Sequence, residues 1–289
     1  MPDLLARLSD RPLVADGATG TELQKRLGNP GECYEALNQT HPDVVRDLAA
    51  AYAAAGSDII TTNSFGGSRL KLARVGLGSQ ARALSITAAR LAREGAGSDV
   101  LIAGSMGSTG RLIEPLGDLS EEEAVECFSE QAAALAEGGA DLILVETMMS
   151  LEEALAAVRG ARQAADIPVA CTFAFVMSHR TMFGVGVEDA VRSLEQAGAA
   201  AVGFNCGELT LESALTLVEE FAAVASVPVI AQPNAGLPEL VAGETVFRET
   251  PESMGEYARR FVAAGAAIVG GCCGSTPEHI RSMVKALRP

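Results

Sequence analysis

The chain has 289 residues, of which 48% are apolar, 4% aromatic and 20% charged, enough apolar material for a sizeable core and too much for a disordered chain. Its 22 Lys and Arg residues against 37 Asp and Glu residues give a net charge of −15, which argues against nucleic acid or an anionic membrane as partner. The sequence contains no secretory signal and no run of about 18 apolar residues that could form a membrane helix, so we expect a cytoplasmic protein.

Eight short apolar runs recur along the chain and predict eight buried parallel strands. In chain order they lie within residues 12–17, 53–62, 100–105, 137–147, 167–173, 196–206, 227–233 and 264–273. Four runs follow an Ala-Gly or Gly-Gly pair, where glycine is expected to end the preceding helix in the left-handed conformation. Most intervals carry an amphipathic helical pattern, such as residues 120–139, where Ser120 is the expected N-cap and Glu123 follows three positions later.

Eight strand–helix units in a chain of this length predict a (β/α)8 barrel, which we expect to form a single domain over residues 1–289. A doubly wound open sheet is the alternative. Such sheets usually have fewer strands, and no Gly-x-Gly-x-x-Gly follows the first apolar run. No linker or low-complexity stretch divides the sequence, which favours one domain.

Polar residues follow the predicted strands, at the end of a barrel where catalytic groups lie. Asp16 and Glu146 each end an apolar run, which predicts a site for a cation such as a substrate ammonium; the alternative is that each caps the next helix or loop. The backbone amides of residues 17–20 are suited to receive an anion such as a carboxylate. An ammonium site beside an anion site fits an amino acid. Four weaker candidates either line the site or form local hydrogen bonds: Thr62, Ser105, Asn205 and Asn234.

The six cysteines are expected to be thiols or metal ligands rather than disulfides. Cys206 follows the sixth strand and the pair Cys272–Cys273 follows the eighth, and these strands flank the seventh in a barrel. Three thiolates predict a zinc site with an open fourth position, which is the catalytic form. Neighbours on a regular strand point to opposite faces, but the surrounding glycines allow both side chains to turn toward one metal. The remaining cysteines fit small buried side chains: Cys33, Cys127 and Cys171.

Five motifs resemble the homocysteine S-methyltransferase family, which includes betaine–homocysteine methyltransferase and the homocysteine-binding barrel of cobalamin-dependent methionine synthase. They are DGATGTEL at 16–23, GSDIITTNSFGG at 56–67, GFNC at 203–206, PNAG at 233–236 and GGCCGSTPEHI at 270–280. The resemblance implies a (β/α)8 barrel that transfers a methyl group to the homocysteine thiol and forms methionine. The resemblance implies that Cys206, Cys272 and Cys273 are the zinc ligands. It also implies that Asp16 and Glu146 contact the homocysteine ammonium group, and that the backbone amides of Gly17 and Thr19 contact its carboxylate. Asn234 matches a position that fills the fourth zinc site when substrate is absent.

The methyl donor is less clearly indicated. Betaine enzymes of this family resemble one another in an aromatic cage, but Gly66 and Cys33 stand where the cage Tyr and Trp would be, leaving Tyr34 and Phe65 as partial substitutes. The GSTGRLIEPLG stretch more closely resembles the methionine synthase module, whose donor is a methylcorrinoid. Such a donor is expected to come from a separate corrinoid protein, while small sulfonium donors such as S-methylmethionine stay open.

Two other classes compete with a free-standing thiol methyltransferase. One is a homocysteine-presenting subunit that is inactive without a corrinoid protein. The other is a barrel lyase with glycine-rich phosphate loops and a structural zinc with four protein ligands, although none of Lys25, Lys71 and Lys285 ends a strand. His41 and His279 lie at predicted helix starts, so a Ser-His-Asp triad has little support.

Overall fold

The computed structural model describes residues 4–28, 31, 33–241 and 243–288. Eight strands form one parallel sheet in the order β1-β10-β7-β6-β5-β4-β3-β2. Their bounds are β1 Leu13–Val14, β2 Ile59–Thr61, β3 Leu101–Met106, β4 Leu142–Met148, β5 Val169–Phe173, β6 Ala201–Cys206, β7 Val229–Pro233 and β10 Ala266–Val269. A parallel bridge between Ala15 and Ile59 brings the two edge strands together. The predicted (β/α)8 barrel is therefore confirmed, and the open-sheet alternative is excluded.

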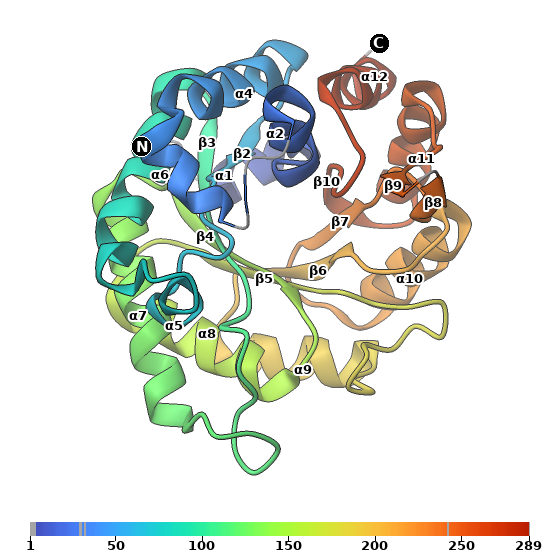
Figure 1. Ribbon diagram of the computed structural model, residues 1–289. Helices are drawn as coiled ribbons and strands as arrows, with labels where there is room; N and C mark the ends of the chain where they lie inside the picture. Colours follow the sequence, from blue (N-terminus) through green and yellow to red (C-terminus); the bar gives the residue numbers. More distant parts are fainter. Residues whose placement is uncertain (1–3, 29–30, 32, 242, 289) are drawn as a thin grey trace.

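The helices surround the strands in chain order (Figure 1). Their bounds are α1 Leu4–Asp10, α2 Gly20–Leu27, α3 Leu37–Thr40, α4 Pro42–Ala55, α5 Arg69–Ala73, α6 Ala81–Ala96, α7 Glu121–Glu137, α8 Leu151–Ala164, α9 Val187–Ala197, α10 Leu211–Val224, α11 Pro251–Ala263 and α12 Pro277–Leu287, with short 3-10 turns η1 Tyr34–Ala36 and η2 Gly78–Gln80. A small antiparallel hairpin, β8 Glu239–Val241 with β9 Glu244–Val246, follows β7 and was not predicted. In the described part of the chain, no helix is long and apolar enough to cross a membrane. The single domain over residues 1–289 stays a prediction.

The helix ends follow the sequence signals, whereas one strand is shorter than its pattern. Ser120 Oγ accepts from the Glu123 N–H at 3.1 Å and so caps α7 as predicted. Gly56 and Gly198 end α4 and α9 in the left-handed conformation, at φ 101° and 84°. The apolar run of residues 264–273 gives a strand over Ala266–Val269 only, although the Gly270 and Cys272 N–H groups still donate to the Ala231 and Pro233 carbonyls of β7.

The core has two layers, one between strands and helices and one inside the barrel. Inside the barrel, small and large apolar side chains fill the axis, as eight-stranded barrels require. The strand residues of this inner layer are Leu13, Ala15, Ile59, Leu101, Ala103, Leu142, Leu144, Ala170, Ala201, Ile230 and Ile268. Leu4 of α1 packs against this layer and is 2% exposed, so α1 closes the N-terminal end of the barrel.

Asp58 ties the chain together at this N-terminal rim. Its carboxylate accepts two hydrogen bonds from Arg11, at 2.7 and 3.0 Å, one from the Val14 N–H at 2.8 Å and one from Arg288. Burial alone would raise the pKa of Asp58, but the Arg11 and Val14 hydrogen bonds and the Arg288 charge outweigh it and lower that pKa. Residues near both ends of the chain are thus held by one ionised carboxylate.

Candidate active site

The alternation that fills the barrel also builds the site at its C-terminal mouth. Side chains two positions apart on a strand share a face, so the residue after the last apolar layer points toward the same axis. On β4, Leu142 and Leu144 lie inside the barrel and Glu146 comes next. The same step on the other strands gives a polar layer above the apolar core: Thr61, Ser105, Glu146, Thr172, Asn205 and Gln232.

A cavity of about 430 Å³ opens above this polar layer. Its lining includes nearly every residue singled out from the sequence. These are Asp16, Gly17, Thr19, Thr62, Ser105, Glu146, Asn205, Cys206, Cys272 and Cys273. Asn234 does not line the cavity; its side chain lies behind the cysteines and donates to the Gly207 carbonyl at 2.9 Å. The structure therefore brings the candidates together, and their roles stay predictions.

Asp16 is a buried carboxylate at the end of β1, 2% exposed. Its Oδ2 accepts from the Thr61 N–H at 2.8 Å and from the Thr61 hydroxyl at 2.9 Å, so it links β1 to β2 and does not cap α2. Burial raises the pKa of Asp16 to about 7, against the lowering effect of the Thr61 hydrogen bonds, and the Glu146 charge raises it further. In the described part of the chain, Asp16 forms no ion pair.

Glu146 faces the same cavity from β4. It accepts from the Ser105 hydroxyl through Oε1 and from Asn205 Nδ2 through Oε2, the latter at 3.1 Å. Burial raises the pKa of Glu146 to about 7. None of the described residues forms an ion pair with this carboxylate either. Asp16 is buried and Glu146 is partly exposed, and the two acids face one cavity that is suited to receive a positively charged group.

Asn205 connects the acid side of the cavity to the sulfur side. Its Oδ1 accepts from the Thr147 N–H and the Thr172 hydroxyl, at 2.7 and 2.6 Å. Its Nδ2 lies 3.7 Å from Cys272 Sγ. Thr147 and Cys206 have φ values of 59° and 57°, a left-handed conformation that is costly for such residues and is concentrated at functional sites. Asn205 holds Thr147 in that conformation.

The three cysteines of β6 and the loop after β10 form a cluster. Their sulfurs all lie within 4.8 Å of one another, and Cys206 Sγ is 3.9 Å from Cys273 Sγ. Hydrogen bonds from Cys272 and Cys273 lower the pKa of the Cys206 thiol. The same contacts with Cys206 raise the pKa of the other two, for Cys273 to about 12. The three thiols thus compete for one negative charge, and a bound cation would favour the ionised form of all three.

The cluster fits a zinc ion. Zinc–sulfur bonds of about 2.3 Å in a tetrahedral site place the sulfurs about 3.8 Å apart, close to the spacing here. The Asn234 side chain lies against Cys206 and helps to lower the pKa of that thiol, and its buried Oδ1 has no hydrogen-bond partner. Within the described residues, this is the one group of His, Cys, Asp or Glu side chains spaced to share a metal.

Comparison with known proteins assigns the family. The sequence profile described as Homocysteine S-methyltransferase matches residues 13–287. The chain belongs to the homocysteine S-methyltransferase family. It is 34% identical to a methionine synthase of Mycobacterium leprae and 35% identical to a methionine synthase of Mycobacterium tuberculosis, in each case over 99% of this chain and 25% of the relative. The chain thus spans about a quarter of the length of these relatives.

Solved structures agree with this family assignment. The homocysteine methyltransferase MmuM from Escherichia coli in its oxidised form superposes with a TM-score of 0.81 at 26% identity, over 98% of this chain and 99% of that one. A metallated form of MmuM gives a TM-score of 0.82 at 24% identity, over 97% of this chain and 98% of that one, which shows the shared fold.

Several residues of this family member escaped the sequence analysis. Glu35 lines the cavity and is buried, and its carboxylate accepts from the Gly66 N–H at 2.5 Å. It lies in the 3-10 turn η1, before α3, and not at a strand end, so no strand pattern marks it. Thr61 and Gln232 do end strands, and extending the alternation of β2 and β7 by one step would have found them.

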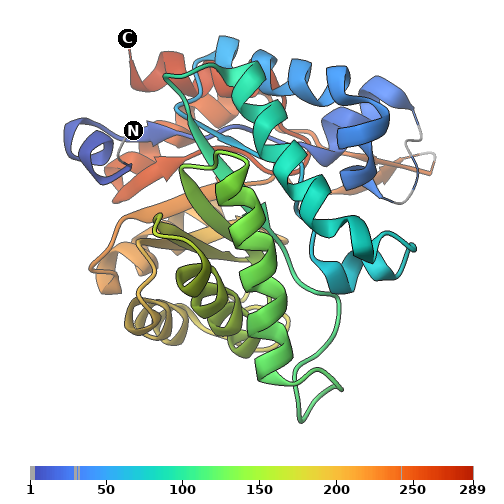
Figure 2. The same cartoon turned by 90° about the vertical axis from the view of Figure 1, so that its left-hand side faces the viewer.

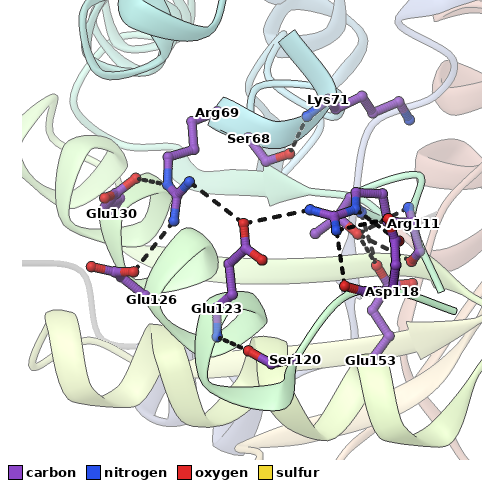
Figure 3. Close-up of polar contacts among 11 residues, drawn as sticks. Ser68, Arg69, Lys71, Arg111, Asp118, Ser120, Glu123, Glu126, Glu130 and Glu153 are labelled. Atoms are coloured by element: carbon purple, nitrogen blue, oxygen red, sulfur yellow. Dashed lines mark hydrogen bonds and ion pairs between the residues drawn. The ribbon is translucent and has the colours of Figure 1, made fainter. Parts of the chain in front are cut away.

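The loop after β3 is anchored beside the cavity mouth. The buried Glu153 of α8 accepts from the Thr109 N–H at 2.8 Å and from its hydroxyl at 2.7 Å. Figure 3 shows the Glu123 carboxylate between the Arg69 and Arg111 guanidinium groups, which joins this loop to α5 and α7. Arg111 also pairs with Asp118 at the far end of the loop, at 3.1 Å. These contacts fix the base of the loop.

His41 and His279 lie at helix starts, as predicted. His279 Nδ1 accepts from the Thr276 N–H at 3.2 Å, which completes a capping box at the start of α12. His41 precedes α4 but its side chain forms no capping hydrogen bond; it contacts Thr40 instead. The remaining cysteines are free thiols, with Cys127 and Cys171 buried and Cys33 half-buried.

Proposed function

We propose that this chain transfers a methyl group to the thiol of homocysteine and forms methionine, with zinc held by Cys206, Cys272 and Cys273. The observation that carries the proposal is the two-sided cavity. On one side are two carboxylates, Asp16 and Glu146, that have no cationic partner among the described residues, and on the other side are three sulfurs. A substrate that fills both sides has an ammonium group at one end and a metal-binding thiol at the other, as homocysteine does.

The chain's own residues supply binding and orientation. Asp16 and Glu146 hold the ammonium group, and residues 17–21, which line the cavity at the start of α2, face the carboxylate. Asn205 keeps Glu146 in place beside Cys272. Bound zinc would lower the pKa of the homocysteine thiol, so that it is a thiolate at neutral pH. Its thiol proton leaves to solvent, the sulfur forms a bond to the methyl carbon, and the bond from that carbon to the donor breaks.

The donor that this structure favours is one presented by a corrinoid protein, and we propose a corrinoid partner on two observations. Lys71 Nζ lies 4.7 Å over the Phe65 ring, so a cationic donor at that ring would meet a like charge. In the described part of the chain, most exposed large apolar side chains lie in the connections that follow strands, on the C-terminal side of the barrel, where a protein partner could dock. Examples are Leu112, Leu116, Met177, Met182, Phe183 and Leu240.

The cavity lining and the cysteine cluster also distinguish the two remaining alternatives, a small onium donor and a lyase. Small onium donors such as S-methylmethionine or betaine stay as the second candidate, because Tyr34 and Phe65 both line the cavity. The lyase is not favoured, since the cluster offers three protein ligands rather than four. We also propose that the protein is cytoplasmic, where cysteine ligands stay reduced.

The test is methionine formation from homocysteine by the purified, zinc-loaded chain with betaine, S-methylmethionine, S-adenosylmethionine or methylcobalamin. We expect turnover with methylcobalamin; turnover only with an onium donor would replace the corrinoid proposal. Cys273→Ala should lose zinc and activity together, measured by metal analysis and the same assay. Cys127→Ala is the matched control, because that thiol is buried in α7 away from the cluster. A zinc-free but active Cys273→Ala protein would refute the metal role.

A further inference from the structure

Ser275 joins the two loops that face each other across the cavity. It is fully buried and does not line the cavity. Its hydroxyl donates to the Cys272 carbonyl at 2.7 Å and accepts from the Ala18 N–H at 3.1 Å. One side chain therefore links the loop that is placed to receive the substrate carboxylate to the loop that carries two of the sulfurs.

Ser275 is tightly packed between these two loops. A Cβ atom on Gly17 would lie 2.6 Å from Ser275 Oγ, and one on Gly271 would lie 2.3 Å from it. Both distances are too short for real contacts, so the serine is wedged between two glycines, one from each loop. A larger residue at Gly17 would collide with Ser275 of the facing loop, and one at Gly271 would displace Ser275 within its own loop.

Tyr52 of α4 supports this junction from behind. It is 1% exposed, its hydroxyl donates to the Ala18 carbonyl at 2.8 Å, and it lies 3.3 Å from the Ser275 carbonyl oxygen. The Gly271 N–H donates to the Asp16 carbonyl at 3.0 Å, one residue from the cysteine pair. These hydrogen bonds connect the two loops to each other and to α4.

We propose that Ser275, backed by Tyr52, is the positioning residue that sets the distance between the amino-acid pocket and the sulfur cluster, and so selects homocysteine over cysteine. The inference rests on the proposed function. Cysteine is shorter by one methylene, so it cannot meet both ends of a cavity whose two walls are fixed. A difference of one methylene is discriminated about 10- to 200-fold by a well-shaped site, and a misplacement of about 1 Å costs about 100-fold.

The experiment measures dissociation constants of L-homocysteine and L-cysteine for the zinc-loaded chain by titration calorimetry, which needs no methyl donor. We expect Ser275→Ala to bind homocysteine more weakly while cysteine binding changes little, so that the preference for homocysteine falls about tenfold. Tyr52→Phe should move the ratio in the same direction by a smaller factor. Zinc content should stay at the wild-type value in both variants.

Ser85→Ala is the matched control, since Ser85 is also buried and its hydroxyl has no hydrogen-bond partner; its ratio should equal that of the wild type. An unchanged ratio in Ser275→Ala, or equal weakening of both ligands, overturns the inference and leaves the proposed function intact. If Ser275→Ala does not fold, the ratio in Tyr52→Phe decides. A wild-type chain that binds no homocysteine in a zinc-dependent way contradicts the proposed function itself.

Discussion

The carboxylates at the two rims of the barrel have opposite electrostatic environments, and their pKa values shift in opposite directions. At the N-terminal rim, Asp58 is held by two guanidinium groups and a backbone N–H, and its pKa is lowered. At the C-terminal rim, Asp16 and Glu146 have hydrogen bonds but no described cationic partner, and the pKa of each is raised to about 7. The first arrangement stabilises the folded chain by itself. The second leaves a charge requirement that a ligand can meet, as expected where stability and chemistry occupy opposite faces of one barrel.

Asp16→Asn should give the largest change in activity, and it tests the difference between the two rims. Removing one carboxylate from a buried ammonium site should lower kcat/KM for homocysteine about 100-fold. Thermal stability at pH 8 should hold or rise, because the unpaired buried charge is gone. Steady-state kinetics and thermal melts of the same preparation check both statements, with Glu146→Gln as the parallel variant. A large loss of stability without loss of kcat/KM would break the comparison.

Asp58→Asn should show the reverse pattern. The variant leaves Arg11 and Arg288 without their charge partner, and because the Arg11 side chain is 43% exposed we expect a loss of about 2 kcal/mol in unfolding free energy rather than the larger cost of a fully buried pair. Activity per folded molecule should stay at the wild-type level. Urea unfolding and kcat/KM at low temperature measure the two quantities, and a selective loss of activity would contradict the division between the rims.

The raised pKa values of Asp16 and Glu146 predict a pH effect of about tenfold for each acid. Methionine, which has the ammonium group but no titrating thiol, should bind about 100-fold more tightly at pH 8 than at pH 6, because both acids must be ionised. The sign for the unliganded chain is opposite. A folded-state pKa above the unfolded value near 4 means that the contribution of these acids to stability is present at low pH and lost as pH rises through about 7. Calorimetric titrations at several pH values measure the methionine affinity, and Asp16→Asn should make its pH dependence weaker. Affinity independent of pH would rule out the acids as the ammonium site.

Arg69→Met should give the smallest effect. Arg69 pairs with Glu126 at 3.3 Å and with Glu130 at 2.8 Å on the outer surface, with side chains that remain a third to two thirds exposed. Exposed pairs of this kind contribute about 0–1 kcal/mol. Urea unfolding should therefore shift little, and methylation kinetics should not change. A loss above about 2 kcal/mol would show that this network resembles the Asp58 cluster more than its exposure indicates.

The fold and most of the cavity lining could be predicted, because both follow from local patterns. Short apolar runs ended in polar residues, and this placed Ser105, Glu146 and Asn205 correctly at the cavity. Glu35 could not be found this way, because it reaches the cavity from the 3-10 turn η1, whose position depends on tertiary contacts such as the one with Gly66. Nor could Ser275 be found, since its role comes from two glycines that meet only after the barrel closes. Thr62 lies in the cavity wall, but its hydroxyl accepts from the Ser105 N–H at 3.0 Å, a loop contact that sequence does not reveal.

Figure 2 shows α1 and the end of α12 on the same side of the barrel. Arg11 and Arg288 reach one carboxylate there, at the rim opposite the cavity mouth. We therefore expect that a tag, a tether or a fused reporter joined near either residue would lie at the N-terminal rim, opposite the cavity mouth. The same geometry would allow the chain to be displayed on a surface with its mouth facing outward, accessible to large as well as small reactants.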